Sequence, residues 1–275
     1  MITLGILGAT TLRYDGREVS LRPTHAVLSL IFASEPGNAL ASHDIQRLAW
    51  PDRVPCGATA ANLRSSIRTF RRSFAAALGR NTLPEGDAFP PERTTIAGHS
   101  GYQMCISESD AEVFGHLATE ARLSLETGRP EAAWAQANEA LRLWRGVPLV
   151  DAGARPFAVG LATRFNELHV AVRLTRAEAG IWRGNQREIT GDLQALAADN
   201  PGNFDAWYLL VNALARSGRV VEAAEACQRA IRYAQTQGIY DLRHERLQHD
   251  LLNAYLPMTG PLWPEQRRVQ NSPAS

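Results

Sequence analysis

The sequence predicts a mainly α-helical protein with a small β component near its N-terminus, and three observations lead to this prediction. Short runs with strand-like patterning occur only within the first 107 residues. From about Asp110 to Leu256, apolar residues recur at helical spacing between breaks that contain Gly or Pro. Hydrophobic residues make up 45% and charged residues 21% of the 275 residues, which is typical of a globular chain with its own core.

Arginine alone carries the positive charge of the chain. All 29 basic side chains are Arg, and the formal net charge is +1. Because there is no Lys, P-loop nucleotide sites, protein kinase chemistry and Schiff-base or Ser–Lys mechanisms are excluded. The sequence also shows no acid–base pair, nucleophile elbow or glycine-rich phosphate loop. We therefore expect no catalytic residues and no cofactor, and we do not expect an enzyme.

The cysteine and histidine pattern does not favour a metal site. Cys56, Cys105 and Cys227 are far apart and odd in number, which favours free thiols in a reducing compartment. No Cys-x-x-Cys pair occurs, and the seven His are scattered. No apolar run is long enough for a bilayer, and no basic segment precedes the apolar N-terminus. We expect a cytoplasmic protein with no membrane partner.

The N-terminal part alternates between strand and helix signals. Strand-like runs cover residues 2–7, 11–14 and 18–21, and Asp15-Gly16 predicts a hairpin turn between the last two. Pro23 fits the first position of a helix that ends near Pro36-Gly37. Ser42 predicts the N-cap of a second helix, which ends at Trp50-Pro51.

A third helix, predicted from about Ala58 to Leu78, carries the clearest functional signal. Leu63, Ile67, Phe70 and Phe74 form one apolar face. Residues 57–80 contain five Arg and no acidic residue. On the opposite side Ser65, Arg68 and Arg72 face outward, flanked by Arg64 and Arg71 on one side and Thr69 on the other. Such a face suits a DNA groove, because Arg forks onto guanine edges and phosphates; a solvated face of a surface helix is the alternative.

Two strand-like pieces follow, residues 94–96 and 102–106, around a tight loop at 97–101. The later, all-helical part has Gly184 and Gly218 34 residues apart, the tetratricopeptide period. One unit follows that repeat's pattern through Trp207, Leu210, Leu214, Ala223 and Ala230. We predict a stack of helical hairpins here.

The order of hairpin sheet, three helices and final hairpin resembles the OmpR/PhoB-type winged helix-turn-helix. Residues 1–256 further resemble the Streptomyces antibiotic regulatory protein (SARP) family, in which a winged helix precedes a bacterial transcriptional activator domain. The resemblance rests on short segments: Gly5-Ile6-Leu7-Gly8, Asp15-Gly16-Arg17, Leu48-Ala49-Trp50-Pro51, the run from Leu63 to Arg72, Gly101-Tyr102, the run from Ala140 to Gly146 with Pro148-Leu149, and Gly218-Arg219 with Glu222-Ala223.

The resemblance implies a domain order and a function. It implies a winged helix-turn-helix DNA-binding domain at 1–107 and a tetratricopeptide-like activator domain at 108–256. Residues 257–275 are rich in Pro and polar residues, and we expect them to form a flexible tail. It implies an activator of a secondary-metabolite gene cluster that binds direct repeats in promoter DNA at the nucleoid and recruits RNA polymerase, with the helical domain supporting a homodimer. The expected DNA-binding residues are Arg64, Ser65, Arg68, Thr69 and Arg72 at the groove, Arg71 on a phosphate, and Ser42, His99 and Ser100 as further backbone contacts.

Two other functions stay open at this point. A helical-repeat interaction protein with weak or no DNA binding would use the same C-terminal hairpins. A small ligand in the helical domain could also control the protein, and the sequence neither supports nor excludes one.

Overall fold

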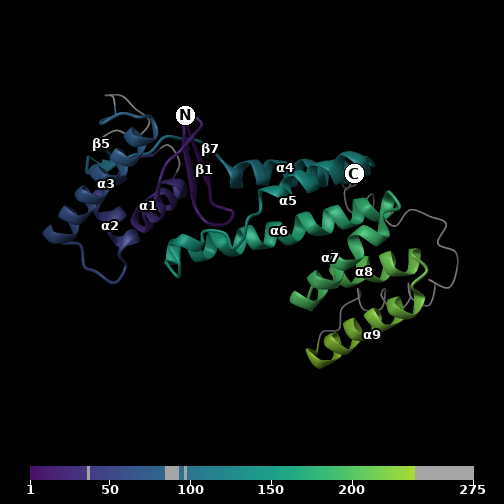
Figure 1. The fold of residues 1–275 in the computed structure, drawn as a ribbon. Helices are drawn as coiled ribbons and strands as arrows, with labels where there is room; N and C mark the ends of the chain where they lie inside the picture. Colours follow the sequence, from purple (N-terminus) through teal and green to yellow (C-terminus); the bar gives the residue numbers. More distant parts are fainter. Residues whose placement is uncertain (36–37, 84–92, 96–97, 239–275) are drawn as a thin grey trace, which may run out of the picture. The chain divides into compact units, whose positions relative to one another are not determined.

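The computed structural model describes residues 1–35, 38–83, 93–95 and 98–238, and the predicted flexible tail lies outside this part of the chain (Figure 1). The chain divides into two compact units. Unit 1 contains Met1–Thr119 and Glu139–His169, and unit 2 contains Glu120–Asn138 and the chain from Val170 onward. Among the described helices, none has the length and apolar character needed to span a bilayer.

The N-terminal sheet of unit 1 has the strand order β3-β2-β1-β7. Strands β1 (Ile2–Gly5), β2 (Thr11–Tyr14) and β3 (Arg17–Glu18) are antiparallel neighbours. The turn between β2 and β3 has positive φ at both Asp15 (47°) and Gly16 (76°), as a two-residue hairpin turn requires. The predicted hairpin is therefore confirmed, although its returning strand ends at Glu18 rather than at Leu21.

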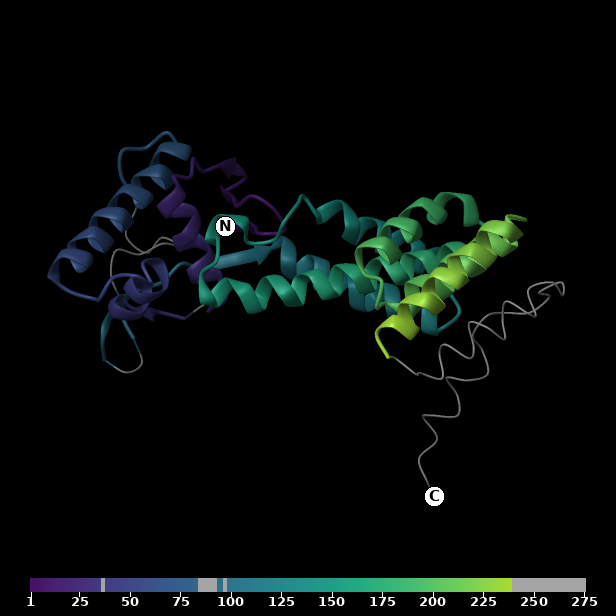
Figure 2. The same ribbon diagram turned by 90° about the horizontal axis from the view of Figure 1, so that it is seen from below.

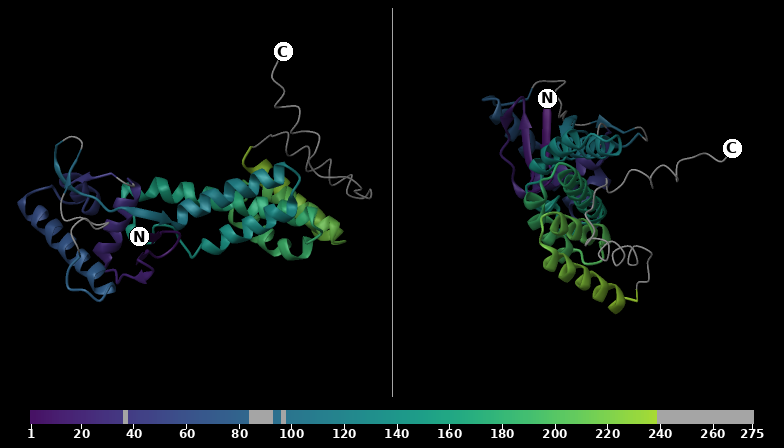
Figure 3. Two further views of the ribbon diagram at one scale, coloured as in Figure 1. Left: turned by 90° about the horizontal axis from the view of Figure 1, so that it is seen from above. Right: turned by 90° about the vertical axis from the view of Figure 1, so that its right-hand side faces the viewer.

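The second sheet corrects the prediction for the final hairpin. It has the order β4-β6-β5, with β4 at Leu40–Ala41, β5 at Arg93–Thr94 and β6 at Ser100–Tyr102. The predicted returning strand at 102–106 is wrong, because β6 ends at Tyr102. Ile106 instead begins β7 (Ile106–Ser109), which pairs in parallel with β1 and leads directly into α4 (Asp110–Glu126) (Figure 3).

Three helices complete the winged part of unit 1. They are α1 (Pro23–Ser34), α2 (Ser42–Ala49) and α3 (Gly57–Ala77), and Figure 2 shows α3 as a long helix with α1 beside it. Pro23 occupies the first turn of α1, as predicted. The apolar faces of these helices share one core with the N-terminal sheet: Leu4, Leu12, Leu28, Ile31, Ile45, Leu63, Ile67, Phe70 and Phe74 are all buried in it.

The segment after α5 (Pro130–Leu143) closes against the loop between β1 and β2. The Arg145 amide donates to the Leu7 carbonyl at 2.7 Å, and the Leu149 amide donates to the Ile6 carbonyl at 2.9 Å. A short 3₁₀ turn at Val150–Ala152 follows and packs on α1. Residues 139–169 are therefore built into the same unit as the winged part.

Unit 2 contains the predicted helical hairpins. After α6 (Pro156–Trp182) come α7 (Gln186–Asp199), α8 (Phe204–Arg216) and α9 (Val220–Thr236) (Figure 1). Helix α8 packs against both α7 and α9. Gly184 and Gly218 both form turns with positive φ, near 80°. Trp207, Leu210, Leu214, Ala223 and Ala230 are all buried, so the repeat pattern marks the core of this unit.

Candidate nucleic-acid interface

Helix α3 presents the predicted basic face. Leu63, Ile67, Phe70 and Phe74 are buried on one side, and Arg64, Ser65, Arg68 and Arg72 are exposed on the other. Within the described part of the chain, no ion pair occupies the guanidinium groups of Arg64, Arg68 or Arg72. This side of α3 therefore carries a row of guanidinium groups whose charge is not neutralised by an ion pair among the described residues. Guanidinium groups donate paired hydrogen bonds to guanine edges and to phosphates.

Two residues at the flanks of the predicted face, Arg71 and Thr69, are only partly exposed. Arg71 is half-buried at the side of the row. Thr69 is also half-buried, and its hydroxyl donates to the Ser66 carbonyl at 2.9 Å and lies 3.1 Å from Nε2 of His25. Because the hydroxyl proton is used on Ser66, Nε2 of His25 must carry the proton that joins the two side chains. Thr69 thus ties α3 to α1.

His25 is a buried histidine that lies directly behind the basic face. Its ring stacks on Phe70, with centroids 4.7 Å apart and an angle of 16° between the planes. Burial, and to a lesser extent the positive charge of Arg22, lower the pKa of His25 to about 4. The ring is therefore neutral at physiological pH. Sequence reasoning missed this role, although His25, Leu28 and Phe32 share one buried helical face.

The N-terminus of α3 is held by a polar network to α2. The Cys56 amide donates to the Thr59 hydroxyl at 2.7 Å, and that hydroxyl lies 2.7 Å from Oε1 of the buried Gln46. Gln46 in turn donates to the Ser42 carbonyl at 3.1 Å. Hydrogen bonds from the Thr59 backbone, the Thr59 side chain and the Ala58 backbone lower the pKa of the exposed Cys56 thiol. The network joins the two helices of the helix-turn-helix.

The C-terminus of α3 ends in a Schellman motif. The Arg80 amide donates to the Ala75 carbonyl at 2.8 Å, and Gly79 has a φ of 71°. Arg17, the first residue of β3 in the N-terminal sheet, donates to the Ala77 carbonyl at 3.4 Å. A cation at a helix C-terminus is favourable, so this sheet also helps to position α3.

The three predicted backbone contacts outside α3 come together at one place. Strand β4 leads into α2 at Ser42 and pairs with β6, which begins at Ser100 next to His99. Gly101 makes this pairing possible, because a Cβ at that position would lie 2.1 Å from the Leu40 carbonyl oxygen. One detail of the prediction is wrong: Ser42 is the first residue of α2 rather than its N-cap, and Ala41 occupies the cap position.

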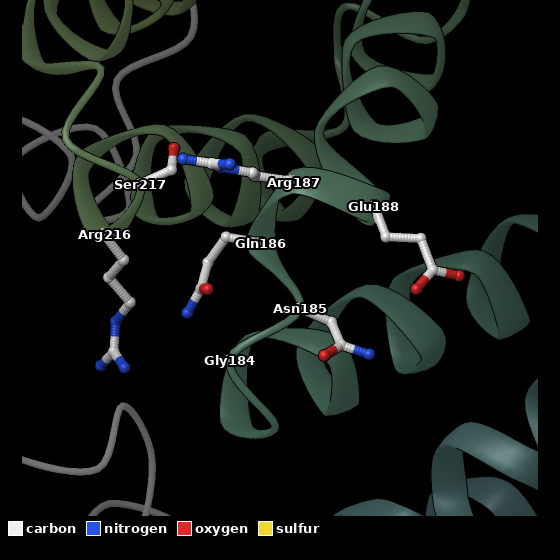
Figure 4. A pocket seen from close by; sticks show the side chains of 7 residues that line it. All are labelled: Gly184, Asn185, Gln186, Arg187, Glu188, Arg216 and Ser217. Atoms are coloured by element: carbon white, nitrogen blue, oxygen red, sulfur yellow. The ribbon is translucent and has the colours of Figure 1, made fainter.

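A shallow hollow in unit 2 does not resemble a reaction site. It has a volume of about 460 Å³ and lies between the start of α7 and the end of α8 (Figure 4). Its lining is polar, with Arg187, Glu188 and Arg216 as the charged members, and Glu188 pairs with Arg176 at 3.3 Å. Among the described residues, no group of three or more His, Cys, Asp or Glu is placed to hold a metal ion.

Comparison with known proteins finds one matching family and two related regulatory proteins. Residues 109–252 match the family described as the bacterial transcriptional activator domain. The regulatory protein DnrI of Streptomyces peucetius is 30% identical over 230 residues, which is 81% of each chain. The regulatory protein AfsR of Streptomyces griseus is 28% identical over 200 residues, which cover 72% of this chain but only 19% of that protein.

The fold also has a counterpart among solved structures. Mycobacterium tuberculosis EmbR, solved in complex with a low-affinity phosphopeptide, aligns with a TM-score of 0.76 at 23% sequence identity. The alignment covers 92% of this chain and 65% of the EmbR chain. This likeness shows that the two proteins share the fold.

Proposed function

Because the chain belongs to the SARP family of transcriptional activators, a family of regulators rather than enzymes, we propose that it binds promoter DNA in a sequence-specific way through α3. The observation that carries this proposal is the row of exposed arginines on α3, Arg64, Arg68 and Arg72, which no ion pair within the described residues neutralises. A helix with such a face fits the major groove, which is about 12 Å wide.

The residues divide into base readers and backbone contacts in this proposal. Arg64, Ser65, Arg68 and Arg72 face the base edges, because they are the exposed members of the row. Arg71, at the side of the row, contacts a phosphate. Thr69 positions α3 through His25 and contributes to the groove only at its margin. Ser42, His99 and Ser100 contact the DNA backbone where α2 meets the wing.

The proposal extends to the regulatory role of the chain. Residues 1–107 bind direct repeats in promoters of a secondary-metabolite gene cluster, and the tetratricopeptide-like domain at 108–256 supports a homodimer and recruits RNA polymerase. The protein then works in the cytoplasm, at the nucleoid. The family match and the similarity to DnrI support this role.

Footprinting on the promoters of neighbouring genes tests the DNA-binding part. Arg68→Ala and Arg72→Ala should each weaken specific binding by roughly 1–3 kcal/mol, or about 5- to 150-fold. Arg71→Ala should make the slope of log K against log salt concentration shallower by about 0.9, because one phosphate contact is lost. The matched control is Arg164→Ala, an exposed arginine on α6. If Arg68→Ala and Arg72→Ala bind as tightly as this control, the assignment of α3 is wrong.

A transcription assay tests the activation part. Run-off transcription with purified RNA polymerase should increase when the protein is added to a footprinted promoter. With Arg68→Ala, the same increase should need a higher protein concentration, in proportion to its weaker binding. Absence of any footprint would favour the alternative function, a helical-repeat interaction regulator. The stacked hairpins α7 to α9 are the feature that such a protein would use.

A further inference from the structure

Two histidines meet where α2 and the wing join. His43, the second residue of α2, lies edge-on against the ring of His99, with centroids 5.6 Å apart and planes at 89°. The contact follows from strand pairing, because β4 pairs with β6. His43 follows β4 along the chain, and His99 directly precedes β6. The two imidazoles therefore come from separate elements that the second sheet holds together.

Both rings are exposed, and one carboxylate lies beside them. Asp44 lies next to the pair, with Oδ2 3.5 Å from Nε2 of His43. Its other carboxylate oxygen accepts from Arg47 at 2.7 Å, so a guanidinium already neutralises this acid. On the wing, the His99 amide donates to Oγ1 of Thr95 at 3.0 Å, and the His99 carbonyl accepts from the Thr95 amide. These hydrogen bonds hold the His99 backbone in place.

We propose that His43 and His99 form a proton-linked contact to a phosphate of the DNA backbone, an inference that rests on the proposed function. Histidine gains its charge between about pH 8 and pH 5, and an imidazolium can donate from both nitrogens. Two adjacent imidazolium rings repel each other in the free protein, and a phosphate placed against both offsets that repulsion. DNA binding therefore takes up protons, and the affinity for DNA rises as the pH falls.

The readout is the salt dependence of binding at two pH values. The full chain is titrated against a fluorescein-labelled duplex of arbitrary sequence, about 30 base pairs long, because a phosphate contact needs no specific sequence. At about pH 6, compared with about pH 8, the slope of log K against log salt should steepen by about 0.9 for each histidine that becomes charged. His43→Gln and His99→Asn should each remove about half of this change.

Three features make the experiment decisive. His116→Gln, an exposed histidine on α4, is the matched control and should keep the full pH effect. Thermal melts establish that the variants are folded. Because His43 and His99 lie on different elements, the second variant still tests the proposal if the first one does not fold. Titrations with and without EDTA test for a metal ion bridging the rings.

The outcomes separate the inference from the function on which it rests. Binding whose pH dependence is unchanged in both variants overturns the inference alone. A pH effect that disappears with EDTA also overturns it, because a metal rather than protons would then link the rings to DNA. Absence of binding at both pH values refutes the proposed function and the inference together.

Discussion

Arg145 and Asp110 form an ion pair that links the two segments of unit 1, with Nη2 of Arg145 2.8 Å from Oδ2 of Asp110. The same carboxylate accepts from the Ile6 amide at 2.7 Å and from the Leu7 amide at 3.2 Å. Arg145 also donates to the Ala9 carbonyl at 2.9 Å. Gly5 and Gly8 admit the arginine, since a Cβ at either position would lie within 3 Å of its atoms.

The first prediction concerns this pair. Asp110→Ala should lower the free energy of unfolding by about 3 kcal/mol, because two backbone amides lose their acceptor and the Arg145 guanidinium loses its carboxylate partner. Arg145→Ala should cost less, about 1–2 kcal/mol, since its side chain is 36% exposed. Urea unfolding followed by circular dichroism measures both. Glu222→Gln, in an exposed pair, should leave stability nearly unchanged; equal effects for Asp110→Ala and this control would contradict the prediction.

The second prediction concerns the joint between α2 and the wing. Gly101→Ala should separate β4 from β6, because the new Cβ would collide with the Leu40 carbonyl. Hydrogen exchange should then speed up in Leu40–Ala41 and Ser100–Tyr102, while α3 stays protected. Gly160→Ala, where the added methyl group meets no neighbour, is the control and should leave these exchange rates unchanged. Slow exchange in Gly101→Ala would show that the strands tolerate the side chain.

The third prediction is a pH dependence of stability that arises from His25. Its pKa is about 4 in the folded chain and about 6.5 when unfolded, so only the unfolded chain takes up this proton between those values. The free energy of unfolding should therefore fall as the pH drops from about 6.5 toward 4, by roughly 2 kcal/mol at pH 5. His25→Gln keeps the donor to Thr69 and should lose this contribution. Parallel pH profiles for the two proteins would rule out His25 as the source.

The fourth prediction concerns the network between α2 and α3. Thr59→Val keeps the shape of the side chain but removes the hydroxyl group that lies between the Cys56 amide and the buried Gln46. The free energy of unfolding should fall by about 1–3 kcal/mol, because the buried Oε1 of Gln46 loses its hydrogen-bond donor. Thr59→Ser, which restores the hydroxyl, should recover most of the loss. Denaturant midpoints give the comparison, and equal midpoints for the Val and Ser variants would exclude the hydrogen bonds as the cause.

Local patterns in the sequence were enough to predict the elements that local chemistry determines. The Asp15-Gly16 turn, the start of α1 at Pro23 and the buried face of α3 from Leu63 to Phe74 are all where the pattern placed them. Each depends on backbone preference or on apolar spacing within one element, so no distant contact was needed to predict it.

The errors lie where distant segments meet. The strand at Ile106–Ser109 pairs with β1, and no local signal distinguishes that partner from the neighbouring wing strand. Thr69 is half-buried at the flank where helical geometry places it, but its contact with His25 depends on the packing of α1 against α3 and has no local signal. The ring contact between His43 and His99 likewise depends on pairing across β4 and β6. Tertiary context decided each of these positions.

The contact of Arg145 with the β1–β2 loop has a consequence for synthesis of the chain. The ribosome releases the N-terminal sheet and α1 to α3 long before residues 139–169, which complete unit 1. Until those residues emerge, the Ile6 and Leu7 carbonyls lack the amide donors of Leu149 and Arg145. The nascent winged part therefore gains its full set of backbone hydrogen bonds only after the segment that follows α5 has been synthesised.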